Sequence, residues 1–332
     1  MGELATNLRH LLTVWRFFGN KGFLGYTGYK PYWLQARIAV RRDIHEHSCI
    51  LFHRLQQPWP LSSHGPYLGQ MESAVLAVAP QARIINLMND APFANPRASA
   101  YLLAALNNYL PENAVVVAVV DPGVGGSRKA ICLNIGDRWY LGPDNGLLSL
   151  LVSNAGVENC FLAGLHESYM KAASASFHGR DVFAPVAGLL VNGQSPDTYP
   201  LPVDGMAGAS WPGELAEVIY LDGFGNAMTG LRMRNLRDLQ GVVVGEQLVK
   251  PAHTFSSVPA GALFCYENSL GLLEIAANGS NAGRILGLEI GSPVNSTLSY
   301  FPTPPPTGFC GSLSSPVSLL NKSGELFGCR FW

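Results

Sequence analysis

Between Cys49 and about Gly193, short apolar runs rich in β-branched residues alternate with stretches that have helical spacing. The run Val115–Val120 is apolar at every position, which is typical of a central strand that is buried on both faces. Alternation of this kind predicts βαβ units and a parallel sheet. The runs that we expect to be strands are Cys49–Phe52, Ala82–Leu87, Val115–Val120 and Ala130–Asn134.

Two helices are predicted between these strands. The first begins near Pro66, which a first helical turn tolerates, carries apolar residues on one face and stops at Pro80. The second begins at Asn95, an N-cap residue that is followed by a proline, and ends by Pro111.

A different pattern follows residues 194–214, which are rich in Pro, Gly and Ser and are typical of a linker between domains. Short strands at close spacing with glycine turns come next, and they predict a small antiparallel barrel or sandwich. We expect them at Val218–Leu221, Val242–Val244, Ala262–Tyr266 and Ile285–Ile290.

The domain prediction is therefore an N-terminal α/β domain at 49–203 and a small C-terminal β domain at 204–298. Residues 1–48 have no sustained period and are not assigned to either domain. Residues 299–332 form a proline-rich tail without an apolar period, and we do not expect them to join a core.

Composition narrows the class of protein. The chain has 332 residues, 48% of them hydrophobic and 14% charged, with a net charge of −1, which excludes a disordered or polyelectrolyte chain. Nucleic acid and anionic membranes are therefore not expected as partners. The six cysteines form no Cys-x-x-Cys pair, and neither a membrane-spanning stretch nor a signal peptide is evident, so a cytoplasmic location is expected.

The strand at Val115–Val120 is followed by Asp121-Pro-Gly-Val-Gly-Gly-Ser-Arg128. Glycines at the carboxyl edge of a central strand let backbone N–H groups approach a ligand. The segment is not G-x-G-x-x-G and no Gly-Lys-Ser/Thr follows, so the dinucleotide and P-loop interpretations both fail. A tight turn with an Asp cap and a surface Arg is the structural alternative.

Further candidate segments are individually weak, because caps, turns or a structural histidine explain each of them. They are Gly142-Pro-Asp-Asn-Gly146, Phe177-His-Gly-Arg-Asp181, Asp222-Gly-Phe-Gly-Asn226 and Tyr266-Glu-Asn-Ser-Leu-Gly271. A metal site is a further alternative, with Asp43, His45, His47 and Cys49 at alternate positions and His53 nearby, although alternating histidines on a strand more often face water.

In this order, however, the segments VVDPGVGGSR, GPDNGLL, FHGRDVFAP, LDGFGNAMT and YENSLGLLEIA closely resemble the S-adenosylmethionine hydroxide adenosyltransferase family. This family is related to the adenosyl chlorinases and fluorinases. The resemblance runs from about Cys49 to Val294. It implies an N-terminal domain with a Rossmann-like, mainly parallel sheet, a C-terminal β-barrel, and a homotrimer whose sites lie between one subunit's N-terminal domain and its neighbour's barrel.

The resemblance also implies the reaction, which is attack of water or hydroxide on the ribose C5′ of S-adenosylmethionine, without a metal or redox cofactor. The residues that match the water-holding set of the family are Asp121, Arg128 and His178. Asp121 and His178 would accept from the water and orient it, while Arg128 would fix Asp121 and favour hydroxide. Fluorinases lack this set, so its presence favours water over halide.

The resemblance implies substrate contacts in both predicted domains. The amino-acid end is expected at Asp222 and Ser269, and adenine at Phe224, Asn226 and the backbone near Ala282. Phe93 would form a wall of the ligand site or, on the simpler interpretation, would be an ordinary core aromatic.

The chain departs from the family after its first strand, where relatives read Thr-Asp-Phe and the Asp binds the ribose hydroxyls. Here the strand is followed by residues 53–60, HRLQQPWP. Codons can be chosen for these residues such that reading them one base later gives Thr-Asp-Phe-Ser-Ser-His-Gly. Residues 62–65 then repeat Ser-Ser-His-Gly, so we hypothesise a short duplication that is read out of frame. A second departure is Asn86-Leu-Met-Asn89, where relatives usually read Asp-Leu-Thr-His.

Three functions follow from this comparison. The first is hydrolysis of S-adenosylmethionine to adenosine and methionine. The alternative is a protein that binds adenosine or S-adenosylmethionine with weak or no turnover, because loss of the ribose Asp removes hydrogen bonds to a charged group. The third is a halogenase that uses S-adenosylmethionine.

Overall fold

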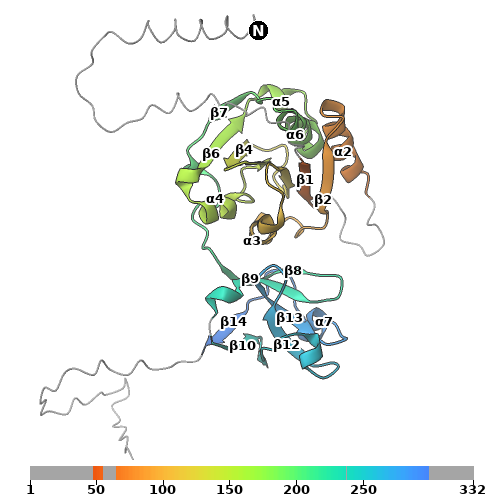
Figure 1. Cartoon of the computed structure of the whole chain (residues 1–332), viewed down its shortest axis with the longest axis vertical. Helices are drawn as coiled ribbons and strands as arrows, with labels where there is room; N and C mark the ends of the chain where they lie inside the picture. Colours follow the sequence, from red (N-terminus) through yellow and green to blue (C-terminus); the bar gives the residue numbers. More distant parts are fainter. Residues whose placement is uncertain (1–47, 55–64, 237, 299–332) are drawn as a thin grey trace, which may run out of the picture.

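The computed structural model describes residues 48–54, 65–236 and 238–298 (Figure 1). The sequence predictions for residues 1–47 and 299–332, the metal hypothesis at Asp43, His45 and His47, and most of the segment after the first strand lie outside the described residues.

The first part of the chain forms a seven-stranded sheet with the order β2-β1-β3-β5-β4-β6-β7. The strands are β1 (Ser48–His53), β2 (Arg83–Met88), β3 (Val115–Val119), β4 (Ala130–Ile135), β5 (Arg138–Pro143), β6 (Cys160–Leu165) and β7 (Thr198–Pro200). The four strands that the apolar runs predict are all present. β3 is buried at all of its positions, as its apolar run predicts.

The sheet is mixed, so the expectation of a mainly parallel sheet is wrong. β2, β1, β3 and β5 are neighbours in parallel, whereas β4 pairs antiparallel with both β5 and β6, and β7 pairs antiparallel with β6. β4 and β5 are joined by only two residues, and the first, Gly136, has φ 58°. A connection this short can only reverse the chain into a hairpin, because a parallel neighbour needs a long crossover.

Helices cover both faces of this sheet (Figure 1). In β1, Cys49 and Leu51 face one layer of helices while Ile50 and Phe52 face the other, the alternation expected of a strand with two buried sides. The first layer holds α2 (Tyr67–Val78), α5 (Ser168–Lys171) and α6 (Ala184–Val191), and the second holds α3 (Pro96–Leu106) and α4 (Ser149–Ala155). The Asn95 side chain caps α3 by accepting from the Ala98 N–H at 3.0 Å, which confirms the predicted start.

The second part of the chain contains two antiparallel sheets around one apolar core. One has the order β12-β13-β9-β8 and the other β11-β10-β14. Their strands are β8 (Leu215–Leu221), β9 (Ala227–Arg232), β10 (Leu239–Val244), β11 (Gln247–Val249), β12 (Leu263–Glu267), β13 (Leu272–Ala277) and β14 (Asn295–Leu298).

The strand predicted at Ile285–Ile290 is wrong, because the chain forms the short helix α7 (Ala282–Leu286) there. The Asn281 side chain accepts from the Arg284 N–H at 2.7 Å and caps the start of the helix. Gly287 adopts a left-handed conformation with φ 62° and ends it. These two local signals outweigh the apolar run that suggests a strand.

The two parts of the chain contact each other through α3 and β8. Ala98, Leu102 and Ala105 of α3 belong to one apolar cluster with Leu215 and Ile219 of β8. The segment predicted as a linker, 194–214, contributes β7 to the large sheet, so only its later part connects the two parts.

Within the described ranges, no helix is long and apolar enough to cross a membrane. The same residues contain no group of three or more His, Cys, Asp or Glu side chains that could hold a metal ion.

Candidate functional site

Asp121, Arg128 and His178 form one hydrogen-bonded cluster. Arg128 Nε donates to Asp121 Oδ1 at 3.1 Å, and Arg128 Nη2 donates to Asp121 Oδ2 in the second arm of a bidentate ion pair. Arg128 Nη2 also lies 2.8 Å from His178 Nδ1. Arg128 and His178 are 50 residues apart in the sequence, so the fold brings together the three side chains that the motifs single out.

The backbone around this cluster is tightly packed. Asp121 and Arg128 lie at the two ends of the loop between β3 and β4, in which Gly125 has φ 77°. A Cβ at Gly125 would lie 2.3 Å from the Ala175 carbonyl oxygen, so only glycine fits. His178 directly precedes a π-helical turn, η4 (Gly179–Phe183), and such turns frequently occur at functional sites.

Electrostatics fix the protonation of His178. Burial lowers the pKa of its imidazole, and the neighbouring Arg128 guanidinium lowers the pKa further. A guanidinium only donates hydrogen bonds, so Nδ1 must accept and the proton of the neutral ring lies on Nε2. His178 therefore offers a donor at Nε2, rather than the acceptor that the sequence-based role assumes.

Arg128 has one further donor. Its Nη1 is buried, and among the described residues it has no hydrogen-bond partner. An unpaired buried donor costs about 1–3 kcal/mol. Arg128 Nη1 and His178 Nε2 together provide donors that could stabilise a water oxygen or hydroxide.

A cavity of about 830 Å³ lies in the second part of the chain. Aromatic, amide and acidic side chains line it, and none of the described lining residues is Lys, Arg or His. The lining residues are Asp222, Phe224, Asn226, Met228, Phe255, Tyr266, Asn268, Ser269, Glu274, Ala277, Gly279, Ser280 and Asn281. Four residues predicted from the sequence, Asp222, Phe224, Asn226 and Ser269, thus border one cavity.

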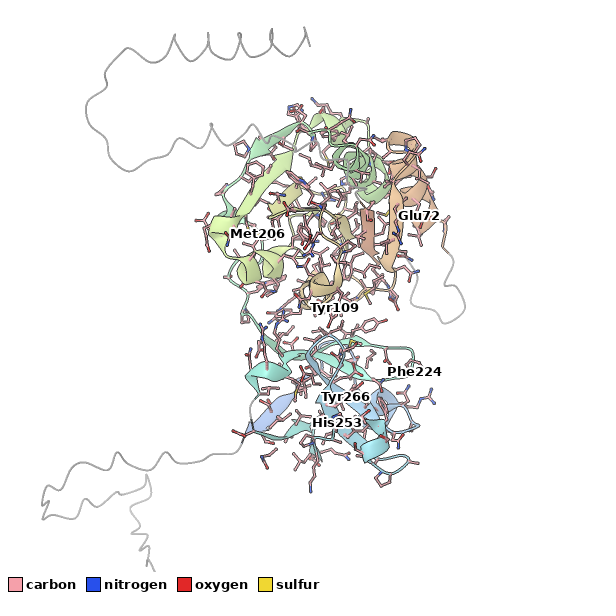
Figure 2. All side chains as sticks on the ribbon, in the orientation of Figure 1. Glu72, Tyr109, Met206, Phe224, His253 and Tyr266 are labelled. Carbon is pink, nitrogen blue, oxygen red and sulfur yellow. The ribbon has the colours of Figure 1, made fainter. Side chains whose placement is uncertain are left out.

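Asp222 organises the turn between β8 and β9. Its Oδ1 accepts from the N–H groups of Phe224 and Asn226, both at 2.9 Å, and its Oδ2 accepts from Asn226 Nδ2 at 2.9 Å. The Asn226 amide is thereby oriented with its oxygen free to accept. Phe224 projects from this turn with 82% of its surface exposed, which is available for stacking (Figure 2).

Two predicted binding residues do not line the cavity. Ala282 is fully buried at the start of α7, next to the lining residue Asn281. Phe93 follows β2 and is 61% exposed, so the interpretation as an ordinary core aromatic is wrong. The Arg54 guanidinium lies 5.9 Å from the centre of the Phe93 ring.

Tyr266, Asn268 and Glu274 line the same cavity, although the sequence analysis assigns none of them a role. Glu274 is 2% exposed and accepts from the Tyr266 hydroxyl at 2.6 Å and from Asn268 Nδ2 at 2.8 Å. The signal that could have found it is a single acid within the fully buried strand LLEIAA.

The end of β1 carries the departure from the family's sequence pattern. Arg54 stands where the ribose Asp is expected, and its Nη1 donates to the Asp90 carbonyl oxygen at 2.9 Å. His53 is fully buried, neither of its ring nitrogens has a partner among the described residues, and burial lowers its pKa to about 4.

Comparison with known proteins agrees with the resemblance. A curated (R)-S-adenosyl-L-methionine hydrolase of Thermus thermophilus is 40% identical over 243 residues, which cover 69% of this chain and 93% of that protein. The protein with the same name from Salinispora arenicola is 36% identical, over 70% of this chain and 92% of that protein.

Two solved structures have the same fold. An uncharacterized conserved protein from Thermotoga maritima gives a TM-score of 0.63 at 28% identity, over 75% of this chain and 99% of that one. A conserved hypothetical protein from Thermus thermophilus gives 0.61 at 35% identity, over 76% and 100%.

The family models divide the chain into two matched regions. The SAM hydroxide adenosyltransferase N-terminal domain matches residues 61–199, and the C-terminal domain of the same family matches residues 216–295. These regions together span more than half of the chain and contain both the Asp121–Arg128–His178 cluster and the cavity. The chain therefore belongs to the SAM hydroxide adenosyltransferase family.

Proposed function

We propose that the chain hydrolyses S-adenosyl-L-methionine to adenosine and L-methionine. The named relatives support this activity, and so does the Asp121–Arg128–His178 cluster. The single observation that carries the mechanism is the buried Arg128, which binds Asp121 and His178 and keeps Nη1 free for a nucleophile.

The reaction is a substitution at the ribose C5′. The oxygen of water attacks C5′, the C5′–S bond breaks with its electron pair going to sulfur, and methionine leaves as a neutral thioether. One proton of the water is released as the C–O bond forms. Because the sulfonium is already a good leaving group, the protein mainly has to hold the nucleophile in line and exclude bulk water.

Each member of the cluster has a separate task in this proposal. Arg128 Nη1 and His178 Nε2 donate to the attacking oxygen and favour its hydroxide form, since charge-assisted hydrogen bonds stabilise an oxyanion. Asp121 accepts from the water and is itself held by the two arms of Arg128. No step requires a metal or redox cofactor, because no electrons are transferred and the leaving group needs no Lewis acid.

The cavity supplies the substrate contacts. We assign Asp222 and Ser269 to the amino-acid end, with Phe224 stacking on adenine while Asn226 and the backbone at Ala282 hydrogen-bond to it. Phe93 would border the ligand from the large sheet. The exposure of Phe93 and Phe224 in the single chain supports this assignment, because a ligand or a neighbouring subunit would cover both rings.

A homotrimer is the assembly that fits a site made of two halves, the Asp121–Arg128–His178 cluster and the cavity. In it, the Asp121–Arg128–His178 cluster of one subunit faces the cavity of its neighbour. We further propose that the large sheet is a Rossmann-like variant and that the two small sheets close into a barrel. The apolar core that those two sheets share supports the barrel.

The experiment is chromatography of S-adenosylmethionine after incubation with the purified chain. Release of adenosine and methionine is the expected result, whereas binding without release identifies the non-catalytic alternative. Release of 5′-chloro-5′-deoxyadenosine in chloride would identify a halogenase. The same assay on a version that restores Thr-Asp-Phe in place of residues 53–60 measures how the altered end of β1 affects turnover. We expect the affinity for S-adenosylmethionine to rise more than about tenfold in this version.

A further inference from the structure

Glu274 is an acidic residue in an otherwise apolar strand. All six residues of β13 are buried, and Glu274 is 2% exposed. Burying a carboxylate costs several kcal/mol unless hydrogen bonds satisfy it. Here one oxygen accepts from the Tyr266 hydroxyl at 2.6 Å and the other from Asn268 Nδ2 at 2.8 Å. The carboxylate is therefore built into the floor of the cavity by two partners that also line it.

Asn268 connects Glu274 to the turn between β12 and β13. Its Oδ1 accepts from the N–H groups of Leu270 at 2.9 Å and Leu272 at 3.0 Å. Ser269 lies in this turn and borders the cavity, and its carbonyl oxygen accepts from the Tyr109 hydroxyl of the first part of the chain. The position of Ser269 thus depends on Glu274 through Asn268.

Tyr266, in the second part of the chain (Figure 2), lines the cavity and connects it to Glu274. Burial, together with the hydrogen bond to Glu274, raises the pKa of its hydroxyl, which stays protonated. Because its only proton is donated to Glu274, the hydroxyl oxygen can only accept from a ligand. Asp222 lines the same cavity. Burial raises the pKa of Glu274, and the negative charge of Asp222 raises it further.

This end of the cavity therefore has carboxylate and hydroxyl acceptors and, in the described lining, no basic side chain. A primary ammonium group is a ligand of matching charge and hydrogen-bonding capacity. We propose that Glu274 is the positioning residue that selects the amino-acid end of the substrate, by fixing the Ser269 turn and by making Tyr266 a pure acceptor. The inference rests on the proposed function, which assigns Asp222 and Ser269 to that end.

The decisive variant is Glu274→Gln. Its amide keeps the shape of the side chain but must donate from one of its two ends, so either the Tyr266 hydroxyl turns its proton into the cavity or Asn268 loses its partner. We expect KM for S-adenosylmethionine to rise about tenfold while kcat changes by less than about threefold. The Kd of adenosine, which lacks the amino-acid end, should stay within about twofold in titration calorimetry.

A matched control is Thr229→Val in the neighbouring strand β9. Thr229 is fully buried and donates to the Leu273 carbonyl oxygen at 2.8 Å, but it does not line the cavity. This variant loses a buried hydrogen bond of the same sheet, so we expect a lower Tm with an unchanged KM. If a general loss of sheet stability were the cause, Tm and KM would change in the same way in both variants.

Tyr266→Phe is the second variant, and it decides the matter if Glu274→Gln does not fold. It should weaken the binding of S-adenosylmethionine in the same way and leave the binding of adenosine unchanged. Equal weakening of both ligands, or an unchanged KM, would overturn the proposal. If the unaltered chain releases no adenosine, the proposed function fails separately, and calorimetry with S-adenosylhomocysteine against adenosine then tests the selection of the amino-acid end.

Discussion

At the scale of single residues, Arg128 joins a carboxylate and an imidazole. It uses Nε and Nη2 for its contacts with Asp121 and His178 and keeps Nη1 unpaired within the described structure. The arrangement resembles a preorganised oxyanion site more than a conventional general base, because the free hydrogen-bonding groups of Arg128 and His178 are donors.

Replacing Arg128 with Ala should lower kcat by about 100- to 1,000-fold, since it removes a donor to the nucleophile and releases Asp121 and His178. Binding of adenosine should remain within about threefold, because the proposed role of Arg128 is to hold the water and not the adenosine. Single-turnover kinetics measure the first quantity and calorimetry the second. Loss of adenosine binding in a variant with unchanged circular dichroism would refute the role.

The pH dependence of turnover should report His178. Burial and Arg128 hold its pKa below the usual value near 6.5, so the ring is neutral at about pH 7 and protonates only in more acidic solution. Protonation places a second cation on Nδ1 beside Arg128 and ends their hydrogen bond. The log of kcat/KM should therefore be flat near neutrality and fall on an acidic limb below about pH 6.5, and His178→Gln should remove that limb. A limb that persists in this variant would assign the titration to another group.

At the scale of secondary structure elements, the end of β1 buries an unpaired histidine close to the Asp121–Arg128–His178 cluster. His53 is paired in register with Val119 of β3, two residues before Asp121. Neither of its ring nitrogens has a partner within the described structure. Such a group is neutral in the fold but gains a proton readily once the chain unfolds.

The free energy of unfolding should therefore fall as the pH drops from 6.5 toward 4. The folded pKa of about 4 lies below the unfolded value, so the unfolded chain binds the extra proton in this window. The difference corresponds to an upper value of about 3 kcal/mol. His53→Leu, which suits the apolar neighbours Cys49 and Leu51, should flatten this slope, as urea unfolding midpoints at several pH values would show. Equal slopes would mean that His53 has a partner that satisfies it.

The same elements show what a sequence can and cannot predict. The apolar run at β3 and the cap of α3 predict these elements correctly because both signals are local. The direction of β4 depends instead on the two-residue connection at Gly136, and α7 depends on the Asn281 cap, which the neighbouring apolar run obscures.

The candidate site is likewise predictable from the sequence only in part. The motifs identify Asp121, Arg128 and His178, whereas the distances between these side chains depend on the fold. Glu274 lies within the motif YENSLGLLEIA, but the motif alone assigns it no role, because its contacts with Tyr266 and Asn268 join β13 to an adjoining strand and turn. Its role therefore becomes visible only when the two strands pair.

At the scale of the whole molecule, the proposal of a shared site can be tested by complementation. Light scattering should give a mass three times the 35.7 kDa of one chain. Chains with Arg128→Ala and chains with Asp222→Ala should each be inactive alone. After random reassembly of an equal mixture, about a quarter of all sites pair an intact cluster with an intact cavity, so activity should return to about that level. Mixtures that stay inactive would place each complete site within one chain.

The helix α3 has a consequence for how the molecule holds together. One side of it completes the core beneath the large sheet, and the other side packs on β8, so it serves both halves at once. A gene cut at residue 204 would therefore yield two fragments that each expose a new apolar surface, and not two self-sufficient modules. For the same reason heat should melt the folded halves in one cooperative step, and a molecule that occupies either half should stabilise the other.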